Sequence, residues 1–64
     1  MTRFAFPAPI GSRARIFVLG MPLEDTVTGY AVRTYGSAGW TTDVPCYILD
    51  KAGAWPCHDC EVLR

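Results

Sequence analysis

The stretch SRARIFVLG (residues 12–20) alternates between apolar and polar side chains along most of its length. On an extended chain, Ala14, Ile16 and Val18 fall on one face, and the opposite face begins with two arginines. A period of two residues is typical of a β-strand with one buried face. The stretch therefore predicts a first strand and a fold that is built from sheet.

The residues that follow fit the same fold class. We expect MPLED (21–25) to be a loop, and TVTGYAVRTYG (26–36) to be a second strand, because β-branched and aromatic residues suit a pleated sheet. Gly29 inside this segment indicates a bulge or a sharp bend. SAGWTTD (37–43) is expected to be a second loop, and VPCYIL (44–49) a third strand.

The last part of the chain completes an all-β pattern. DKAG (50–53) predicts a tight turn, AWP (54–56) a short fourth strand and EVLR (61–64) a fifth, with one turn at 56–60. Five short strands with glycine-bearing turns in about 50 residues predict a small closed or nearly closed barrel, since a sheet this small must curl to bury one face and hide its edges. The apolar strand positions predict a core that contains Ile16, Val18, Val27, Trp55 and Val62.

Residues 1–11 are expected to form an extended arm, and residues 12–64 the barrel. Pro7 and Pro9 each remove a backbone donor and bias the preceding residue towards an extended conformation. The arm is expected to be pinned to the barrel by Phe4, Phe6 or Ile10.

Composition limits the classes of function. The chain has 64 residues, half of them apolar, so we expect one small folded domain. Six basic residues balance six acidic ones, and no overall field draws the chain to nucleic acid or to an anionic membrane. We see no apolar run near the ~20 residues of a membrane span and no signal-peptide core. We therefore expect a cytoplasmic protein that does not bind membranes and keeps its cysteines reduced.

Several segments together carry a family resemblance: the opening strand GSRARI, a long first loop, TVTG at the start of the second strand, the hairpin LDKAGAW, and the ending WPCHDCEVL. Residues 11–64 thus resemble the SH3-like small β-barrels, the group of the KOW, Tudor and plasmid type II dihydrofolate reductase barrels. The resemblance implies a five-stranded SH3-like barrel with an extended N-terminal arm and a single 3₁₀ turn before the last strand. It also implies that Cys60 takes a position that is normally held by a buried leucine.

The ending contains Cys57-His58-Asp59-Cys60, which has the spacing of half a zinc site. Cys46 together with His58 could complete a Cys₃His set. However, Cys57 and His58 are adjacent and would both have to bend back onto one ion, and only Cys46 remains as a distant ligand. We expect no metal and no other cofactor, and the set Cys46, Cys57, His58 and Cys60 is the alternative.

Enzymatic chemistry is not indicated. Three neighbours on one turn, Cys57, His58 and Asp59, point in different directions, whereas catalytic groups normally converge on a pocket from separate parts of a fold. Type II dihydrofolate reductases line their pore with a Val-Gln-Ile-Tyr stretch, and the corresponding region AWPCHDC (54–60) has neither the Gln nor the Tyr. We expect no catalytic residues, and an oligomeric enzyme of that type is our third hypothesis.

The aromatic residues offer the best binding site. Trp40 stands in a segment rich in Gly and Thr, where an indole has little to pack against, and Tyr35 and Arg33 share a face of the preceding strand. In SH3-like barrels, aromatics beside the long loops bind Pro-rich peptides, methylated side chains or bases. The predicted binding residues are Trp40, Tyr35, Arg33 and Tyr30.

These observations favour a small non-enzymatic module that binds another protein or its own copies. A compact domain with balanced charge also suits the accessory proteins of phages and plasmids, including inhibitors of host systems. The alternative is a nucleic-acid-binding barrel of the KOW or Tudor type that would use Arg13, Arg15, Arg33 and the aromatics, although the neutral net charge does not favour it. Phosphate contacts would make the affinity fall steeply with ionic strength.

Overall fold

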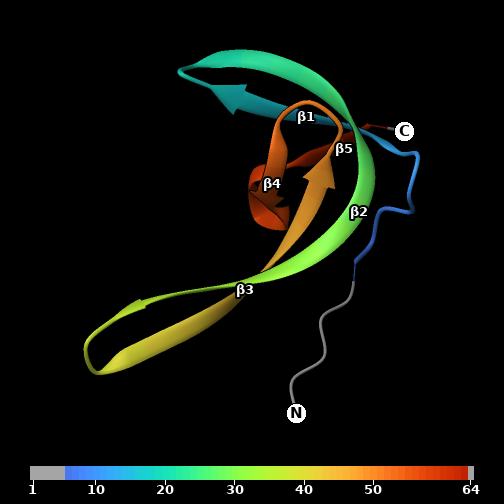
Figure 1. Cartoon of the computed structure of the whole chain (residues 1–64). Helices are drawn as coiled ribbons and strands as arrows, with labels where there is room; N and C mark the ends of the chain where they lie inside the picture. The colour runs from blue at the N-terminus through green and yellow to red at the C-terminus, as the bar shows by residue number, and fades with distance from the viewer. Residues whose placement is uncertain (1–5, 64) are drawn as a thin grey trace.

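The structure is a computed structural model that describes residues 6–63. These residues form one antiparallel sheet with the strand order β4-β3-β2-β1-β5, and they include no α-helix. The strands are β1 (Arg13–Val18), β2 (Met21–Ser37), β3 (Trp40–Leu49), β4 (Gly53–Pro56) and β5 (Glu61–Leu63), with the 3₁₀ turn η1 (Cys57–Asp59) between the last two. The all-β prediction and the 3₁₀ turn are confirmed. The sheet is not closed, because β4 and β5 are its two edges and do not pair with each other (Figure 1).

Strand β2 pairs with two different strands along its length. Residues 21–26 pair with β1, and residues 27–37 pair with β3. A straight strand of this length would span roughly 55 Å. The longest dimension of the molecule is only 37 Å, so β2 has to curve, as Figure 1 shows. The register shifts between Val27 and Gly29, which confirms the bulge that the glycine predicted.

Both segments predicted as loops are largely strand. Residues 21–25 pair with β1, and only Leu19 and Gly20 form the turn, with φ of 52° and 80°. Two successive positive φ angles are the geometry that suits a two-residue hairpin between twisted strands. Likewise, Trp40 begins β3, and the segment 37–43 keeps only two residues in its turn. These loop predictions are wrong because residues that favour turns also occur at exposed strand positions.

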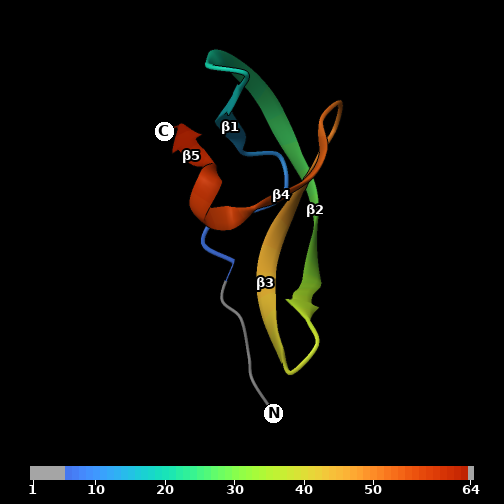
Figure 2. The ribbon, with the colours of Figure 1, turned by 90° about the vertical axis from the view of Figure 1, so that its left-hand side faces the viewer.

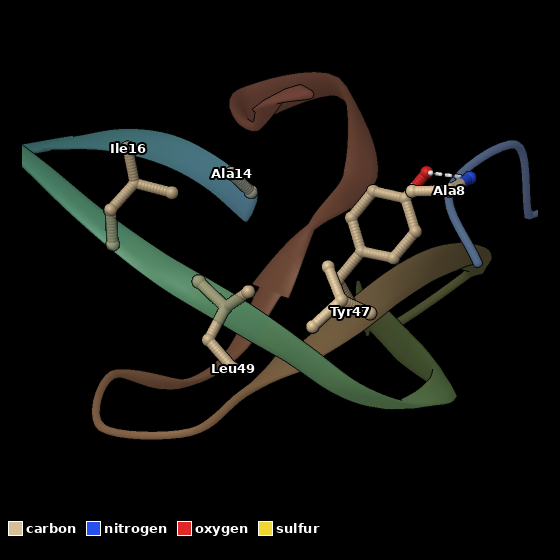
Figure 3. Close-up of a cluster of buried hydrophobic side chains, with 6 residues drawn as sticks. Ala8, Ala14, Ile16, Tyr47 and Leu49 are labelled. Atoms are coloured by element: carbon tan, nitrogen blue, oxygen red, sulfur yellow. Dashed lines mark hydrogen bonds between the residues drawn. The ribbon is translucent and has the colours of Figure 1, made fainter. Parts of the chain in front are cut away.

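The hydrophobic core lies on the inner, concave face of the curved sheet (Figure 3). Its fully buried side chains are Ala8, Ala14, Ile16, Val27, Tyr47 and Leu49. The predictions for Ile16 and Val27 are confirmed, and Trp55 and Val62 pack against the core as partly buried residues. The prediction for Val18 is wrong, since this side chain is exposed. β5 pairs with β1 only as far as Arg15, so the core does not reach the end of the hairpin.

Two tyrosine hydroxyl groups hold the chain that precedes β1. The backbone N–H of Ala8 donates to the Tyr47 hydroxyl at 3.1 Å (Figure 3), and the Tyr30 hydroxyl donates to the Ala8 carbonyl oxygen at 2.6 Å. The ring of Phe6 lies 4.6 Å from that of Tyr30, centroid to centroid. Residues 6–8 are therefore fixed on the inner face by hydrogen bonds and by aromatic packing.

Of the three side chains that were predicted to pin the arm, Phe6 packs against the core and Ile10 is exposed. Phe4 lies outside the described residues, as do the other residues of 1–5. After the arm, the Gly11 N–H donates to the Val27 carbonyl oxygen at 2.8 Å, and this bond leads the chain into β1.

One carboxylate is buried at the centre of the sheet. Asp25 is only 3% exposed, and its oxygens accept hydrogen bonds from the backbone N–H groups of Thr26, Lys51 and Ala52 at 2.8 to 2.9 Å. These bonds join β2 to the turn between β3 and β4. Burial alone raises the pKa of Asp25, but the three amide hydrogen bonds and the Lys51 charge outweigh it, and the pKa is lowered.

We predict that Ile16→Ala lowers the free energy of unfolding by about 2–5 kcal/mol, because it leaves a cavity in a very small core. The matched control is Val18→Ala on the same face of β1, which should cost less than about 1 kcal/mol because Val18 is exposed. Urea unfolding of both variants measures the difference. Equal losses would contradict the core as described.

We also predict that Asp25→Asn lowers the free energy of unfolding by about 1–3 kcal/mol at pH 7, because the amide cannot accept hydrogen bonds through both of its polar atoms. A carboxyl whose pKa is lowered by folding contributes stability that is present above its unfolded pKa of about 4 and is lost as the pH falls through its folded pKa.

The parent protein should therefore lose stability in acid below about pH 4, and Asp25→Asn should show a shallower loss over the same range. The control is Asp50→Asn, on the same turn but exposed, which should keep the parental dependence on pH. Thermal melts between pH 2 and pH 7 test this, and three parallel pH profiles would contradict it.

Candidate functional site

The outer face of the sheet, opposite the core, consists of two halves that differ in charge. Over β5, β1 and the first half of β2 it is ionic, because Arg15 lies between Glu24 and Glu61 with N–O distances of 3.8 and 3.6 Å. A guanidinium nitrogen of Arg13 lies 3.9 Å from a carboxylate oxygen of Glu24, and the other terminal nitrogen donates to the Thr26 hydroxyl at 2.9 Å. Exposed pairs of this kind add little stability, but they match both arginines with carboxylates.

Over β2, β3 and β4 the outer face is mainly apolar. Paired residues of antiparallel strands share a face, and on this side the pairs and triplets include Ala31 with Cys46 and Pro56, and Ile48 with Ala54. Towards the ends of β2 and β3 the face continues through Val44 and the aromatics. We call it the outer apolar face and define it by Ala31, Arg33, Tyr35, Trp40, Val44 and Ile48.

Three of the four predicted binding residues meet on this face. Tyr35 pairs with Thr42, and Trp40 pairs with Ser37, so the two aromatic residues are diagonal neighbours across the β2–β3 ladder. Such neighbours lie roughly 7–8 Å apart, within reach of large side chains. Arg33 is two residues before Tyr35 and shares its face. Arg33 is also the only charged residue among the described residues paired on this half of the outer face.

Tyr30 does not join this group. It pairs with Tyr47, which belongs to the core, and its hydroxyl is bonded to the carbonyl oxygen of Ala8. The structure therefore places Tyr30 on the inner face, where it holds the arm. Its odd spacing of three residues from Arg33 was a signal in the sequence that the two point to opposite faces of a strand.

The far part of the β2–β3 hairpin extends from the body as a two-stranded ribbon (Figures 1 and 2). Both of its faces are exposed, and they differ in character. The face opposite Tyr35 is polar near the tip, where the Thr34 hydroxyl donates to Asp43 at 2.8 Å. Gly36 allows the strands to approach each other, since an added Cβ would collide with the Trp40 carbonyl oxygen. The sequence thus builds a ribbon with aromatics on one side only.

The exposure of these aromatics is what makes the ribbon a candidate site. Trp40 is 59% exposed and Tyr35 is 42% exposed. A two-stranded ribbon alone is marginally stable in water, and large exposed apolar groups on it mark interaction surfaces. In Figure 2, β1, β5 and the arm all lie to the left of the ribbon. The arrangement can accept a flat partner surface, with Arg33 available for a carboxylate or an aromatic ring.

Ala31, Val44 and Ile48 also belong to this face, and they were not among the predicted binding residues. A signal was present in β3, where apolar residues occupy both alternating sets of positions between Val44 and Leu49. A strand that is apolar on both sides is typical of a sheet that is covered on both faces. Here the inner face is covered by the core. The outer face is half-buried at Ala31, Val44 and Ile48, and it is exposed at Tyr35 and Trp40.

The residues of the alternative metal set are not gathered around one point. Cys46 is buried in β3, where its thiol donates to the Val44 carbonyl oxygen at 3.5 Å. The Cys60 thiol donates to the Pro56 carbonyl oxygen, also at 3.5 Å, and His58 is exposed. Throughout residues 6–63, no three His, Cys, Asp or Glu side chains are grouped in a way that could hold a metal ion.

The local environment makes two of the thiols weak acids. Burial, followed by the charges of Cys57 and Asp59, raises the pKa of Cys60 to about 11. Burial and the neighbouring Cys46 raise the pKa of Cys57, although a hydrogen bond with Tyr47 opposes the shift. Because the thiolate is the reactive form, both groups are poor nucleophiles at neutral pH.

Comparisons with known proteins give no family: no protein-family model, curated protein or solved structure matches this chain significantly. The described part of the chain contains no pocket. It also contains no helix of the length and apolar character that a bilayer crossing would require.

We predict that at pH 8 Cys60 reacts with iodoacetamide at least tenfold more slowly than free cysteine, and that Cys57 also reacts more slowly than free cysteine, because their raised pKa values keep them protonated. Site-resolved mass spectrometry of the native protein measures both rates, and the urea-unfolded protein is the control. The native protein should also bind no stoichiometric zinc. Fast native labelling, or a zinc-dependent fold that a chelator unfolds, would contradict this view of the cysteines.

Proposed function

We propose that this chain is an SH3-like barrel that acts, without enzymatic activity, by binding another protein through the outer apolar face. The observation that carries the proposal is the pairing register, which puts Trp40, Tyr35 and Arg33 together on one face of the ribbon, where all three are exposed. Aromatic residues and arginine are the types most enriched where interfaces gain their binding energy.

The fold proposal rests on strand order and on the ending. The chain pairs β5 with β1, runs β2 through both halves of the sheet and places one 3₁₀ turn before β5. The single 3₁₀ turn before the last strand is the feature that the sequence resemblance implied. The curvature of β2 brings β5 and η1 over the core, as in a small barrel with an open seam (Figure 1).

A protein partner is favoured over a nucleic acid by the positions of the arginines. Arg13 and Arg15 lie on the ionic half of the outer face and are matched by Glu24 and Glu61. Arg33 lies on the other half, without a second described cation in its paired rows. Nucleic-acid binding requires several cations along one track, whereas one guanidinium beside two aromatics suits an apolar protein surface that presents a carboxylate.

The test is Trp40→Ala, which should abolish binding to the protein's partners and leave the melting temperature within a few degrees of the parent. Immobilised parent protein and variant are exposed to the same extract from the source cells, and the proteins retained by each are identified by mass spectrometry. Any partner should be retained by the parent at both low and high salt, since phosphate contacts are not involved.

Val32→Ala is the matched control, because Val32 is similarly exposed on the same ribbon but lies on the opposite face. It should retain the partners that Trp40→Ala loses. If Trp40→Ala unfolds the protein, or if the two variants retain the same proteins, the outer apolar face is not the binding site.

A further inference from the structure

A second apolar surface lies at the other end of β2, on the hairpin that joins β1 to β2. The tip residue Leu19 is 99% exposed, and Phe17 is 58% exposed. The remaining exposed apolar side chains of this hairpin are Val18, Met21 and Leu23. The hairpin is apolar on both faces, because Phe17 pairs with Pro22 on one side and Val18 pairs with Met21 on the other. None of these residues belongs to the outer apolar face.

The turn itself is unfavourable for a monomer in water. Leu19 has a φ of 52°, in the left-handed region where Gly, Asn and Asp are favoured and a leucine side chain is strained. Packing within the chain does not offset this strain, because the Leu19 side chain is fully exposed. Observed strain of this kind is a reason to look for an interaction that uses the residue.

The same hairpin has a free strand edge. β5 pairs with β1 only at residues 13–15, so the outer edge of β1 has no partner strand from Ile16 to Val18 among the described residues. Val18 pairs with Met21 across the turn, and successive residues direct their backbone groups to opposite edges, so the N–H and C=O of Phe17 point to the free edge. This short edge reads Ile-Phe-Val and has no charge and no proline.

The free edge of β3 is protected where that of β1 is not. β4 pairs with β3 only at residues 46–49, and the unpaired edge beyond it includes Asp43 and Pro45. Charged residues and proline are the devices that prevent strand edges from pairing with other chains. Their absence from the edge of β1 indicates that this edge is free to pair.

We propose that two copies of this chain associate through the free edge of β1, antiparallel and with Phe17 next to Phe17 of the second copy. In this arrangement Ile16 lies opposite Val18 of the other copy, and the two Phe17 backbones exchange hydrogen bonds across a twofold axis. The edge is its own complement, because it carries only apolar β-formers and no charge to repel a copy. The twofold axis uses both edges at once, so association stops at the dimer.

A second copy of the chain fits this surface better than a contact through a pocket or with a charged partner would. The described residues form no pocket in which Leu19 could insert, so the contact is made by edges and by flat apolar faces. The edge contact involves only residues 16–18 of each copy, so it buries less than the roughly 800 Å² per partner of a standard stable interface. The dimer should therefore be weak, with a dissociation constant in the micromolar range.

Sedimentation velocity from about 10 to 500 µM tests this, because a micromolar dissociation constant puts the transition inside that range. The parent should rise from the monomer mass of 7.1 kDa towards twice that mass. Phe17→Lys should weaken dimerisation at least tenfold by placing like charges across the axis. Leu19→Asn should keep or raise the melting temperature, since asparagine tolerates a positive φ.

Trp40→Ala is the control for the other surface, and it should dimerise like the parent. A parent that stays monomeric at the highest concentration overturns the proposal. So does a dimer that Phe17→Lys leaves intact, or one that Trp40→Ala abolishes. Growth beyond the dimer also overturns it, because the twofold edge contact is closed.

Discussion

The Asp25 carboxylate stands where β2 passes from one partner strand to the other, and the rest of the sheet depends on it. Asp25 pairs with Ala14 on β1 and accepts the amides of Lys51 and Ala52 from the turn after β3. A buried carboxylate is tolerated only when hydrogen bonds satisfy it. Both amides can donate to the carboxylate in only one conformation of that turn, so the carboxylate fixes the conformation of the turn. This conformation directs β4 back alongside β3 as an antiparallel strand and brings Trp55 to the core.

A core of this size can fill only the middle of the sheet. β5, η1 and the arm cover the inner face near the centre of β2, and the chain has no further residues among those described with which to cover its ends. Both ends of β2 therefore project as two-stranded hairpins with exposed apolar side chains. In a larger domain these hairpins would be buried by additional elements, and here their exposed apolar surface is a cost that an intermolecular contact can offset.

The sequence predicted the parts of the fold that a period of two and turn chemistry control. The all-β class, the bulge at Gly29 and a turn at 56–60 follow from local residues, whereas the 3₁₀ form of η1 was implied by the family resemblance. Periodicity shows which side of a strand faces inwards, but it does not show how far along the strand the core extends. For this reason Val18 was wrongly assigned to the core. Turn-forming residues such as Pro22 and Ser37 also occur within paired strands, and this is why the ends of both hairpins were expected to be loops.

For the candidate site, the residue types were more informative than their expected location. Trp40 was placed in a loop and lies in β3, yet it still meets Tyr35 and Arg33, because the register of the hairpin brings them to one face. The register depends on pairing between distant residues and could not be read from local pattern. The separation of Tyr30 from this group could have been read, since alternation along a single strand decides it.

The two free surfaces are independent because the segment of β2 between them is held firmly. Main-chain pairing to β1 and β3, the bulge and the Asp25 hydrogen bonds all lie between the two hairpins. The two surfaces share no residue, so contact at one end leaves the other end open. A pair of chains joined at β1 would present two outer apolar faces on one particle, and a partner with repeated sites would then bind with an avidity that exceeds the affinity of either face alone.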